Sequence, residues 1–471
     1  MLLPDRPPGP RVPPWADDDV AFNRAGKMKL QLMAPILVPM NLSRRHLLTG
    51  ATGLAAMATL AACGSNSGGV DTGSTASASG STGGKPKLTQ WYHEYGEKGV
   101  QEAVQRYAKD YQDADVTVKW NPGTDYMKLL ATTLLSGSGV PDVFESENGA
   151  TLDMIQQGQV VDLTSAVGDA ASKFSKPVLD RMTYDGKIYA IPQVVDMQML
   201  YYRPSLLEKA GVKPPTTLAE LIEAAKAVKT SSMGGFFAGN DGGIGVLANL
   251  FIWSSGFNQL NDDRTDVAFL EPNFYDTVTA YRNFYRSGNL LTAASKDWYD
   301  GSAFVNGETA MQWGGLWSLA DITKKWGEDV GVVAFPASGK GGKEVVPFGA
   351  YGSCVAAKGA NHDTEAASKF ATWLWVDQTD KQVDFANSYG THIPSQPDLV
   401  PQCTQIAKGP GKKAAEFVDK VGKANDLFWT AKIADSYTAA LTNVVKKGDN
   451  PRSAFAEVAS TARAELKRVK K

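Results

Sequence analysis

The sequence is poor in the residues that metal and redox chemistry requires. It has 471 residues, yet only four histidines and three cysteines. His93, His362 and His392 lie far apart, with no cysteine or second histidine beside them. Because zinc sites need closely spaced ligands, the spacing excludes a zinc-type site, and we expect no metal and no cofactor. Cys354 and Cys403 are left either free or paired with each other.

Acidic and basic residues are nearly equal in number. The apolar run near the start of the sequence is too short to span a membrane. The chain has 48 Lys and Arg against 50 Asp and Glu, a formal net charge of −2. This gives no basic footprint for nucleic acid, so we expect no nucleic-acid partner. The apolar run at 47–62 contains Gly50 and Gly53 and is about 16 residues long, against roughly 20 for a span. It therefore indicates a signal segment rather than a transmembrane anchor.

The residues around this run have the order of an export signal. Arg44 and Arg45 come directly before it, and Ala61, Ala62 and Cys63 follow Leu60 at its end. Leu-Ala-Ala-Cys resembles the lipobox of bacterial lipoproteins, which implies lipidation of Cys63 and anchorage to the outer side of the cell membrane. The paired arginines resemble the twin-arginine export signal. The alternative is a chance cysteine behind an ordinary signal peptide.

The rest of the chain divides by composition. Residues 1–62 are interpreted as leader and export signal, and residues 63–84, almost all Gly, Ser, Thr and Ala, as a flexible tether. From Lys85 onward, patterns predict strands at 88–92, 116–120 and 140–144 and helices at 100–111 and 126–135. Later patterns predict a helix at 217–228 capped by Thr216 or Thr217, strands at 311–313, 330–335 and 354–357, and helices at 414–424, 430–446 and 451–470.

This alternation of strand and helix predicts an α/β fold with two mostly parallel sheets. The globular part is long enough for two lobes with substantial cores.

Several local patterns resemble the extracellular solute-binding proteins of ATP-driven (ABC) importers, in the group that includes maltose-binding protein. They are Tyr-Asp-Gly-Lys-Ile-Tyr-Ala-Ile-Pro at 184–192, Leu-Tyr-Tyr-Arg-Pro at 200–204, Phe-Val-Asn-Gly-Glu-Thr-Ala-Met at 304–311 and Gly-Gly-Leu-Trp at 314–317. The resemblance covers residues 85–471. It implies a two-lobed, periplasmic-binding-protein-like fold of type II, in which a hinge closes the lobes on a ligand.

The resemblance also implies the layout and the partners. Three interlobe crossings are expected near 194–198, 347–351 and 393–395, with an N-lobe of 85–194 and 350–395 and a C-lobe of 195–349 and 396–471. The partners implied are a small-molecule ligand and ABC permease subunits with their ATPase. We expect a monomer with no enzymatic activity.

Ligand contacts are expected in the loops beyond the carboxyl ends of the strands. These loops combine aromatic rings with carboxylates, which suits a sugar, because a ring covers the apolar face of a pyranose and carboxylates accept from its hydroxyls. An anion binder would instead present arginines or bare helix N-termini. The candidates are Tyr92, Glu94, Glu145, Asp196, Trp253, Trp313, Trp317 and Tyr351.

Each candidate has a structural alternative. Trp253 and Trp313 fit a hydrophobic core as well as a site, and Asp196 would serve equally to hold backbone amides at a hinge. Trp373 and Trp375 are interpreted as core, and His93 and Glu147 as weaker candidates.

Two other functions compete with sugar binding. A secreted glycosidase would use two of these carboxylates, although the sequence has no Gly-x-Ser-x-Gly, His-Glu-x-x-His or phosphate-loop motif. A binding protein for a polyamine, an amino acid or another cation would use the same aromatic and acidic groups as a cationic box.

Overall fold

The computed structural model describes residues 84–470 except 96 and 362. The predicted export signal, Cys63 and all but the last residue of the predicted tether lie outside the described residues. In the described part, no helix is both long and apolar enough to cross a membrane.

The first group of strands is parallel. β1 (Lys87–His93) lies between β2 (Asp115–Asn121) and β3 (Val143–Glu147). The strands predicted at 88–92 and 116–120 are confirmed. The strand predicted at 140–144 is β3, which begins three residues later than predicted. Before it, the Thr89 amide of β1 donates to the Asp142 carboxylate at 2.8 Å instead of to a backbone carbonyl of the neighbouring strand, so regular pairing starts only after Asp142.

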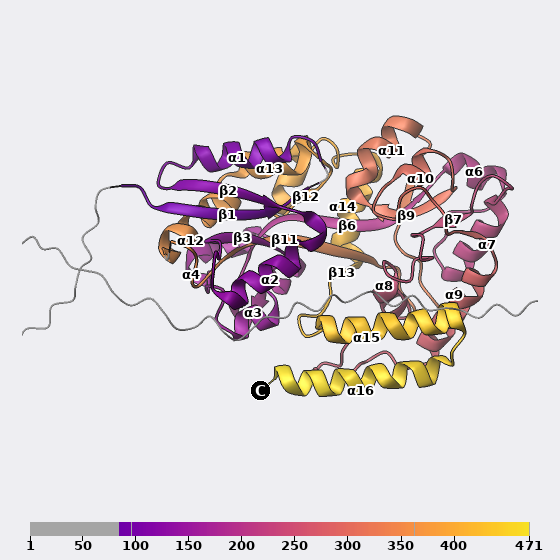
Figure 1. The fold of residues 1–471 in the computed structure, drawn as a ribbon. Helices are drawn as coiled ribbons and strands as arrows, with labels where there is room; N and C mark the ends of the chain where they lie inside the picture. Colours follow the sequence, from indigo (N-terminus) through magenta and orange to yellow (C-terminus); the bar gives the residue numbers. More distant parts are fainter. Residues whose placement is uncertain (1–83, 96, 362, 471) are drawn as a thin grey trace, which may run out of the picture. The chain divides into compact units, whose positions relative to one another are not determined.

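One long strand joins two groups of strands. The first part of β6 (Ile191–Tyr202) pairs with β11 (Val346–Val355) and β12 (Ile393–Pro394), and its last part pairs with β9 (Met311–Gly315) and β10 (Gly331–Val333). Beyond β9 lie β7 (Phe236–Phe237) and β8 (Leu290–Leu291), both parallel. Figure 1 shows β6 running between these groups.

The expectation of two mostly parallel sheets is therefore wrong in two respects. The two groups share β6, and β6 pairs antiparallel with β9, β10, β11 and β12. The alternation of strand and helix signals parallel pairing only where a crossover joins the paired strands, as in β1–β3. β11 meets β6 from a distant part of the sequence, so the local pattern does not fix its direction.

Smaller strands complete the pairing. β4 (Thr183–Tyr184) and β5 (Lys187–Ile188) form a hairpin, and β13 (Gly422–Lys423) pairs with β11. The hairpin turn is made by Asp185 and Gly186, both with positive φ (50° and 73°). Asp and Gly are suited to these backbone angles, which explains the Tyr-Asp-Gly-Lys pattern.

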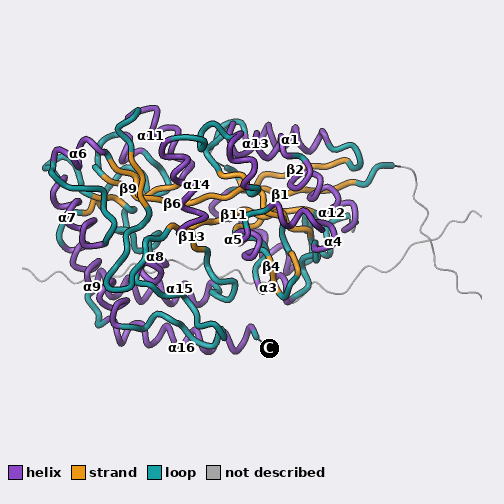
Figure 2. The backbone as a smooth tube through the Cα atoms, turned by 180° about the vertical axis from the view of Figure 1, so that it is seen from behind, coloured by secondary structure: helices purple, strands orange, loops and turns teal. Residues whose placement is uncertain are grey.

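Helices cover both groups of strands (Figure 2). Around the β1 group they are α1 (Val100–Asp110), α2 (Tyr126–Ser136), α3 (Leu152–Gln156), α4 (Thr164–Val167), α5 (Lys176–Arg181), α12 (Thr364–Thr372) and α13 (Thr379–Ser388). Around the β9 group they are α6 (Pro204–Lys209), α7 (Leu218–Val228), α8 (Ala248–Ser254), α9 (Pro272–Arg286), α10 (Ser302–Val305), α11 (Leu319–Trp326), α15 (Ala431–Thr442) and α16 (Pro451–Val469). α14 (Gly409–Val421) packs on β6, β10 and β11, between the two groups.

Local sequence accounts for several of these boundaries. α7 begins with a capping box in which the Thr217 hydroxyl accepts from the Glu220 amide, while the Glu220 carboxylate accepts from the Thr217 amide. This confirms the cap prediction. The C-terminal helix patterns are confirmed as α14, α15 and α16, and a π-helical turn at Asn443–Lys447 continues α15.

The hydrophobic core is divided into two clusters. One surrounds β1, β3 and α12 and contains Trp375, which is fully buried. The other surrounds α7, α9, α15 and α16. Trp373 packs at the edge of the first cluster, so the core interpretation of both tryptophans is confirmed. Cys354 and Cys403 are buried and free, so they do not pair.

The three segments predicted as interlobe crossings lie side by side. In β6, Val195 is opposite both Ala350 of β11 and Ile393 of β12. Residues 194–198, 347–351 and 393–394 thus belong to adjacent strands, and residues of the first two segments line the cavity described next.

Candidate ligand-binding cavity

A cavity of about 580 Å³ lies where β6 and β11 meet the loops around the β9 group. Four of the eight predicted ligand residues line it, namely Asp196, Trp253, Trp317 and Tyr351. Asp196 comes from β6 and Tyr351 from β11, whereas Trp253 lies in the last turn of α8 and Trp317 in the turn before α11. The weaker candidate Glu147, at the end of β3, lines it too.

The other four predicted residues do not line the cavity. Tyr92 and Trp313 are fully buried in the core, and Tyr92 stacks on Trp120 with ring centroids 5.3 Å apart. Glu145 is buried as well, and Glu94 is an exposed loop residue. Tyr92, Glu145 and Trp313 lie on strands, where successive side chains point to opposite faces of the sheet, and these three point away from the cavity.

Buried Glu145 supports the cavity from beneath. Its carboxylate accepts from the His93 amide at 2.6 Å and from the Tyr95 hydroxyl at 2.8 Å, and it lies 2.5 Å from His93 Nδ1. The His93 ring in turn stacks on Tyr351, with centroids 4.7 Å apart. Burial would lower the pKa of His93, but the hydrogen bond and charge of Glu145 outweigh it and raise that pKa. Through His93, Glu145 thus holds Tyr351, which lines the cavity.

Asp196 is held by a buried histidine. Its Oδ1 lies 2.5 Å from His392 Nδ1, and His392 Nε2 lies 3.6 Å from the Glu97 carboxylate. His392 precedes β12, so this contact joins two of the predicted crossings. Asp196 is thus held by a histidine side chain and not, among the described residues, by the backbone amides that the alternative predicted.

Trp317 is presented to the cavity by the glycines before it. A Cβ on Gly315 would lie 2.2 Å from the Trp317 ring, so the indole packs where only glycine fits. Its Nε1 donates to the Tyr299 carbonyl at 2.8 Å, and Trp298 lies edge-on at 6.2 Å. The indole is thereby fixed with one face available.

The sequence analysis missed several lining residues. They are Asn148, Gln198, Asp241, Asn249, Asp297, Trp298 and Asn425. Asp241 accepts from the amides of Gly243 and Gly245, both at 2.8 Å, so it also orders its loop. The adjacent Asp297 and Trp298 gave a local signal of an acid beside an aromatic. The isolated polar residues gave none.

Glu147 is the most electrostatically constrained acid of the cavity. Partial burial raises the pKa of its carboxyl and Asp196 adds to this by repulsion, against the attraction of His93 and Arg181. Carboxylates accept hydrogen bonds, so Glu147 and Asp196 suit a ligand that donates them.

The lining has a consistent chemistry. Among the described residues that form it there are four carboxylates, three tryptophans, one tyrosine and several side-chain amides, but no Lys or Arg. It therefore provides acceptors and aromatic faces but no cationic group. Within residues 84–470, leaving out 96 and 362, no three His, Cys, Asp or Glu side chains are placed to hold a metal ion.

Comparison with known proteins defines the class. The profile of the bacterial extracellular solute-binding protein family matches residues 91–378, and the chain belongs to that family. The predicted resemblance is thus confirmed. The fold is the two-lobed α/β fold of type II periplasmic binding proteins with three crossings, as in the solved structures below.

Several individual relatives are named as sugar-binding proteins. The diacetylchitobiose binding protein DasA of Streptomyces coelicolor is 28% identical over 67% of this chain and 75% of its own length. The maltodextrin-binding protein MdxE of Bacillus subtilis is 26% identical over 73% and 79%. A lactose-binding protein of Rhizobium radiobacter is 30% identical, but this match spans only 35% of the chain and 40% of that protein.

Solved structures agree on the fold. The GacH receptor of Streptomyces glaucescens, solved unliganded and with acarbose, superposes with a TM-score of 0.68 over 81% of this chain and 99% of its own, at 22% identity. The sugar-binding protein MalE of Xanthomonas citri gives 0.67 over 82% and 98%, at 19% identity.

Proposed function

We propose that this protein binds a sugar or oligosaccharide between its lobes and delivers it to the permease of an ATP-driven importer. The observation that carries the proposal is the lining of the 580 Å³ cavity. It combines four carboxylates with aromatic residues such as Trp253, Trp317 and Tyr351, and none of the described residues that line it is Lys or Arg. Indole faces cover the apolar face of a pyranose, and carboxylates accept from its hydroxyls. The sugar-binding relatives support the same ligand class.

The lobes would close on the ligand about the three adjacent crossings. We propose the boundaries expected from the sequence, with 85–194 and 350–395 in one lobe and 195–349 and 396–471 in the other. Asp196 and Tyr351 lie on crossing strands, so closure would bring Trp253 and Trp317 toward them.

The route to the membrane rests on the sequence before the described residues. We propose export by the signal with paired arginines, lipidation of Cys63, and anchorage of a monomer on the outer side of the cell membrane. A Streptococcus pneumoniae relative is named a maltooligosaccharide ABC transporter solute-binding lipoprotein, which supports this route.

A cationic ligand is the second candidate, because four carboxylates line the cavity. A thermal-shift screen of neutral oligosaccharides, polyamines and amino acids separates the two. At 100 times its dissociation constant, a true ligand stabilises the protein by about 2.7 kcal/mol. We expect the melting temperature to rise with oligosaccharides only, and a rise with polyamines or amino acids alone would reject the sugar proposal.

Binding without catalysis is part of the proposal. A glycosidase would use two of the lining carboxylates as acid and nucleophile or base. Asp241 and Asp297 instead accept backbone amides, and Asp196 is held by His392, which favours structural and binding roles for them.

A further inference from the structure

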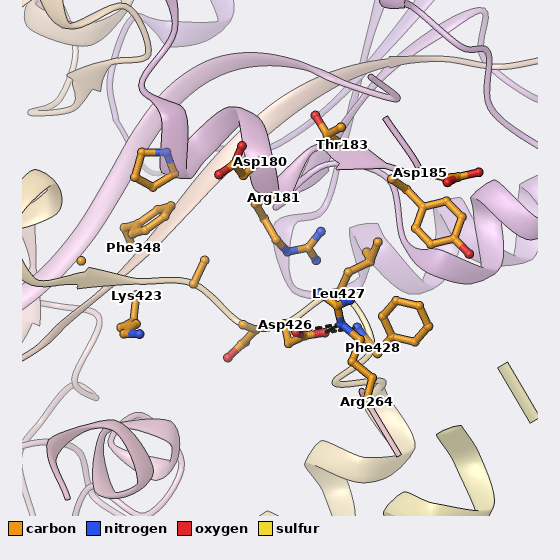
Figure 3. Close-up of a pocket in the computed structure, with 15 residues that line it drawn as sticks. Asp180, Arg181, Thr183, Asp185, Arg264, Phe348, Lys423, Asp426, Leu427 and Phe428 are labelled. Atoms are coloured by element: carbon orange, nitrogen blue, oxygen red, sulfur yellow. Dashed lines mark hydrogen bonds and ion pairs between the residues drawn. The ribbon is translucent and has the colours of Figure 1, made fainter. Parts of the chain in front are cut away.

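A second cavity, of about 720 Å³, adjoins the first. Phe348 and Asn425 line both. One side of the second cavity is formed by the end of α5 and the β4–β5 hairpin, and the other side by residues 422–428 and Arg264 (Figure 3).

Arg181, the last residue of α5, lines this second cavity and has no ion-pair partner among the described residues. Figure 3 shows its guanidinium directed toward the segment that carries Asp426 and Leu427. Nε and Nη1 are buried and have no hydrogen-bond partner among the described residues. No described carboxylate forms an ion pair with the Arg181 guanidinium within 4.0 Å. Other arginines of the described residues do form ion pairs, namely Arg106, Arg203, Arg264, Arg463 and Arg468. Arg181 as a whole is half-buried, but buried guanidinium nitrogens without a partner are costly unless something neutralises them.

The acids nearest to Arg181 are already engaged or distant. Asp426 accepts from Arg264 Nε with both carboxylate oxygens, each at 3.1 Å, and from the Phe428 amide at 2.8 Å. Asp180 pairs with Lys176 at 2.5 Å. Burial lowers the pKa of Arg181, and the charges of Asp426 and Glu147 offset this only in part.

A second basic group lines the same cavity. Lys423 Nζ donates to Asn258 at 3.3 Å and makes no ion pair among the described residues. Three acids line the second cavity. Asp180 and Asp426 form ion pairs, whereas Asp185, an exposed residue of the hairpin turn, forms none with the described residues. The lining of the second cavity thus balances three acids with three basic residues, two of them without an ion pair among the described residues, whereas the first cavity has no basic residue in its lining.

We propose that the second cavity binds the carboxylate of a uronic acid unit, while the neutral part of the same oligosaccharide lies in the first cavity. Guanidinium and carboxylate fit each other through two parallel hydrogen bonds, and such pairs are strong where water is excluded. Phe348 and Asn425 line both cavities, so the cavities are adjacent and one oligosaccharide would extend from the first into the second. This inference rests on the proposed function, because it specifies which oligosaccharides the protein prefers.

The test uses matched pairs of disaccharides, each a neutral sugar and the same sugar with one unit oxidised to a uronic acid. Affinity is measured by titration calorimetry on the purified protein and on three variants. Arg181→Gln removes the charge, and Arg181→Lys keeps the charge but not the planar fork. Arg452→Gln removes an exposed arginine on α16 that lines neither cavity. Thermal melts establish that each variant is folded.

We expect the wild type to bind the uronic acid member of its best pair at least tenfold more tightly. Arg181→Gln should abolish that preference and change neutral-sugar affinity less than twofold, Arg181→Lys should keep part of it, and Arg452→Gln should keep all of it. Equal affinity for both members, or an equal loss for both in Arg181→Gln, overturns the inference and leaves sugar binding intact. An equal loss would assign Arg181 to lobe closure through Asp426. If no sugar of either kind binds, the proposed function itself fails.

Discussion

Trp313 Nε1 donates to Gln198 Oε1 at 2.9 Å, and this bond links the core to the cavity. Trp313 is fully buried against Phe335, whereas Gln198 lines the cavity. Trp313 was predicted to contact the ligand itself. It instead lies in the core and orients Gln198, which lines the cavity.

Trp313→Phe should therefore affect both stability and binding. The ring still packs on Phe335, but Gln198 loses its donor, so the free energy of unfolding should fall by about 1–3 kcal/mol. Affinity for the sugar should fall several-fold, because Gln198 is no longer held. Urea denaturation and titration calorimetry measure the two effects.

Trp375→Phe is the matched control, since Trp375 is equally buried but does not line the cavity. It should destabilise the protein without changing affinity. Unchanged affinity in Trp313→Phe would show that the Gln198 contact has no part in binding.

Trp317→Ala should weaken sugar binding with little cost to stability. The indole is only partly buried, so its removal leaves no closed cavity in the core. Loss of a stacking face should weaken binding by about tenfold. Trp373→Ala, outside the cavity lining, should leave affinity unchanged. Equal effects of the two variants on affinity would contradict the assignment of Trp317 to the site.

His392 should make stability depend on pH. Burial alone would lower the pKa of His392, but the charge and hydrogen bond of Asp196, with Glu97, outweigh burial and raise it above 6.5. The raised pKa means that the protonated form is stabilised on folding. Its contribution is complete below the unfolded value and is lost as pH rises through the higher folded value.

The comparison is between wild type and His392→Gln in thermal melts at several pH values. The excess stability of the wild type should be greatest below about pH 6 and should shrink as the solution becomes alkaline. His93 is present in both proteins, so its own raised pKa cancels in the difference. A difference that grows with pH would contradict the buried pair with Asp196.

Cys354 and Cys403 should resist thiol reagents in the native protein. Both are buried and free, and burial raises the pKa of Cys403 to about 11 and that of Cys354 further. Little thiolate exists at neutral pH, so labelling should require denaturant. Mass spectrometry of unreduced, denatured protein should find two labelled sites at these positions, and labelling at neither would indicate a disulfide.

The sequence predicted most elements because their signals are local. The box at Thr217 and Glu220, the turn at Asp185 and the Gly-Gly before Trp317 each specify a conformation within a few residues. The direction of β11 against β6 was not predictable, because these strands are far apart in the chain.

Of the eight residues predicted to contact the ligand, four line the cavity and four do not, for a related reason. Which face of a strand lines the cavity depends on register, so Tyr92, Glu145 and Trp313 could not be separated from Asp196 and Tyr351 by residue type. Isolated polar residues such as Asn249 and Asn425 acquire a role only when the fold brings their elements together.

Calorimetric titration of the purified protein with the oligosaccharide that stabilises it most tests the central claim directly. The account predicts a finite heat that saturates at one sugar per protein, weakened about tenfold in Trp317→Ala. A steady heat that continues after each injection, from bond cleavage, or saturation that Trp317→Ala leaves unchanged, would contradict it.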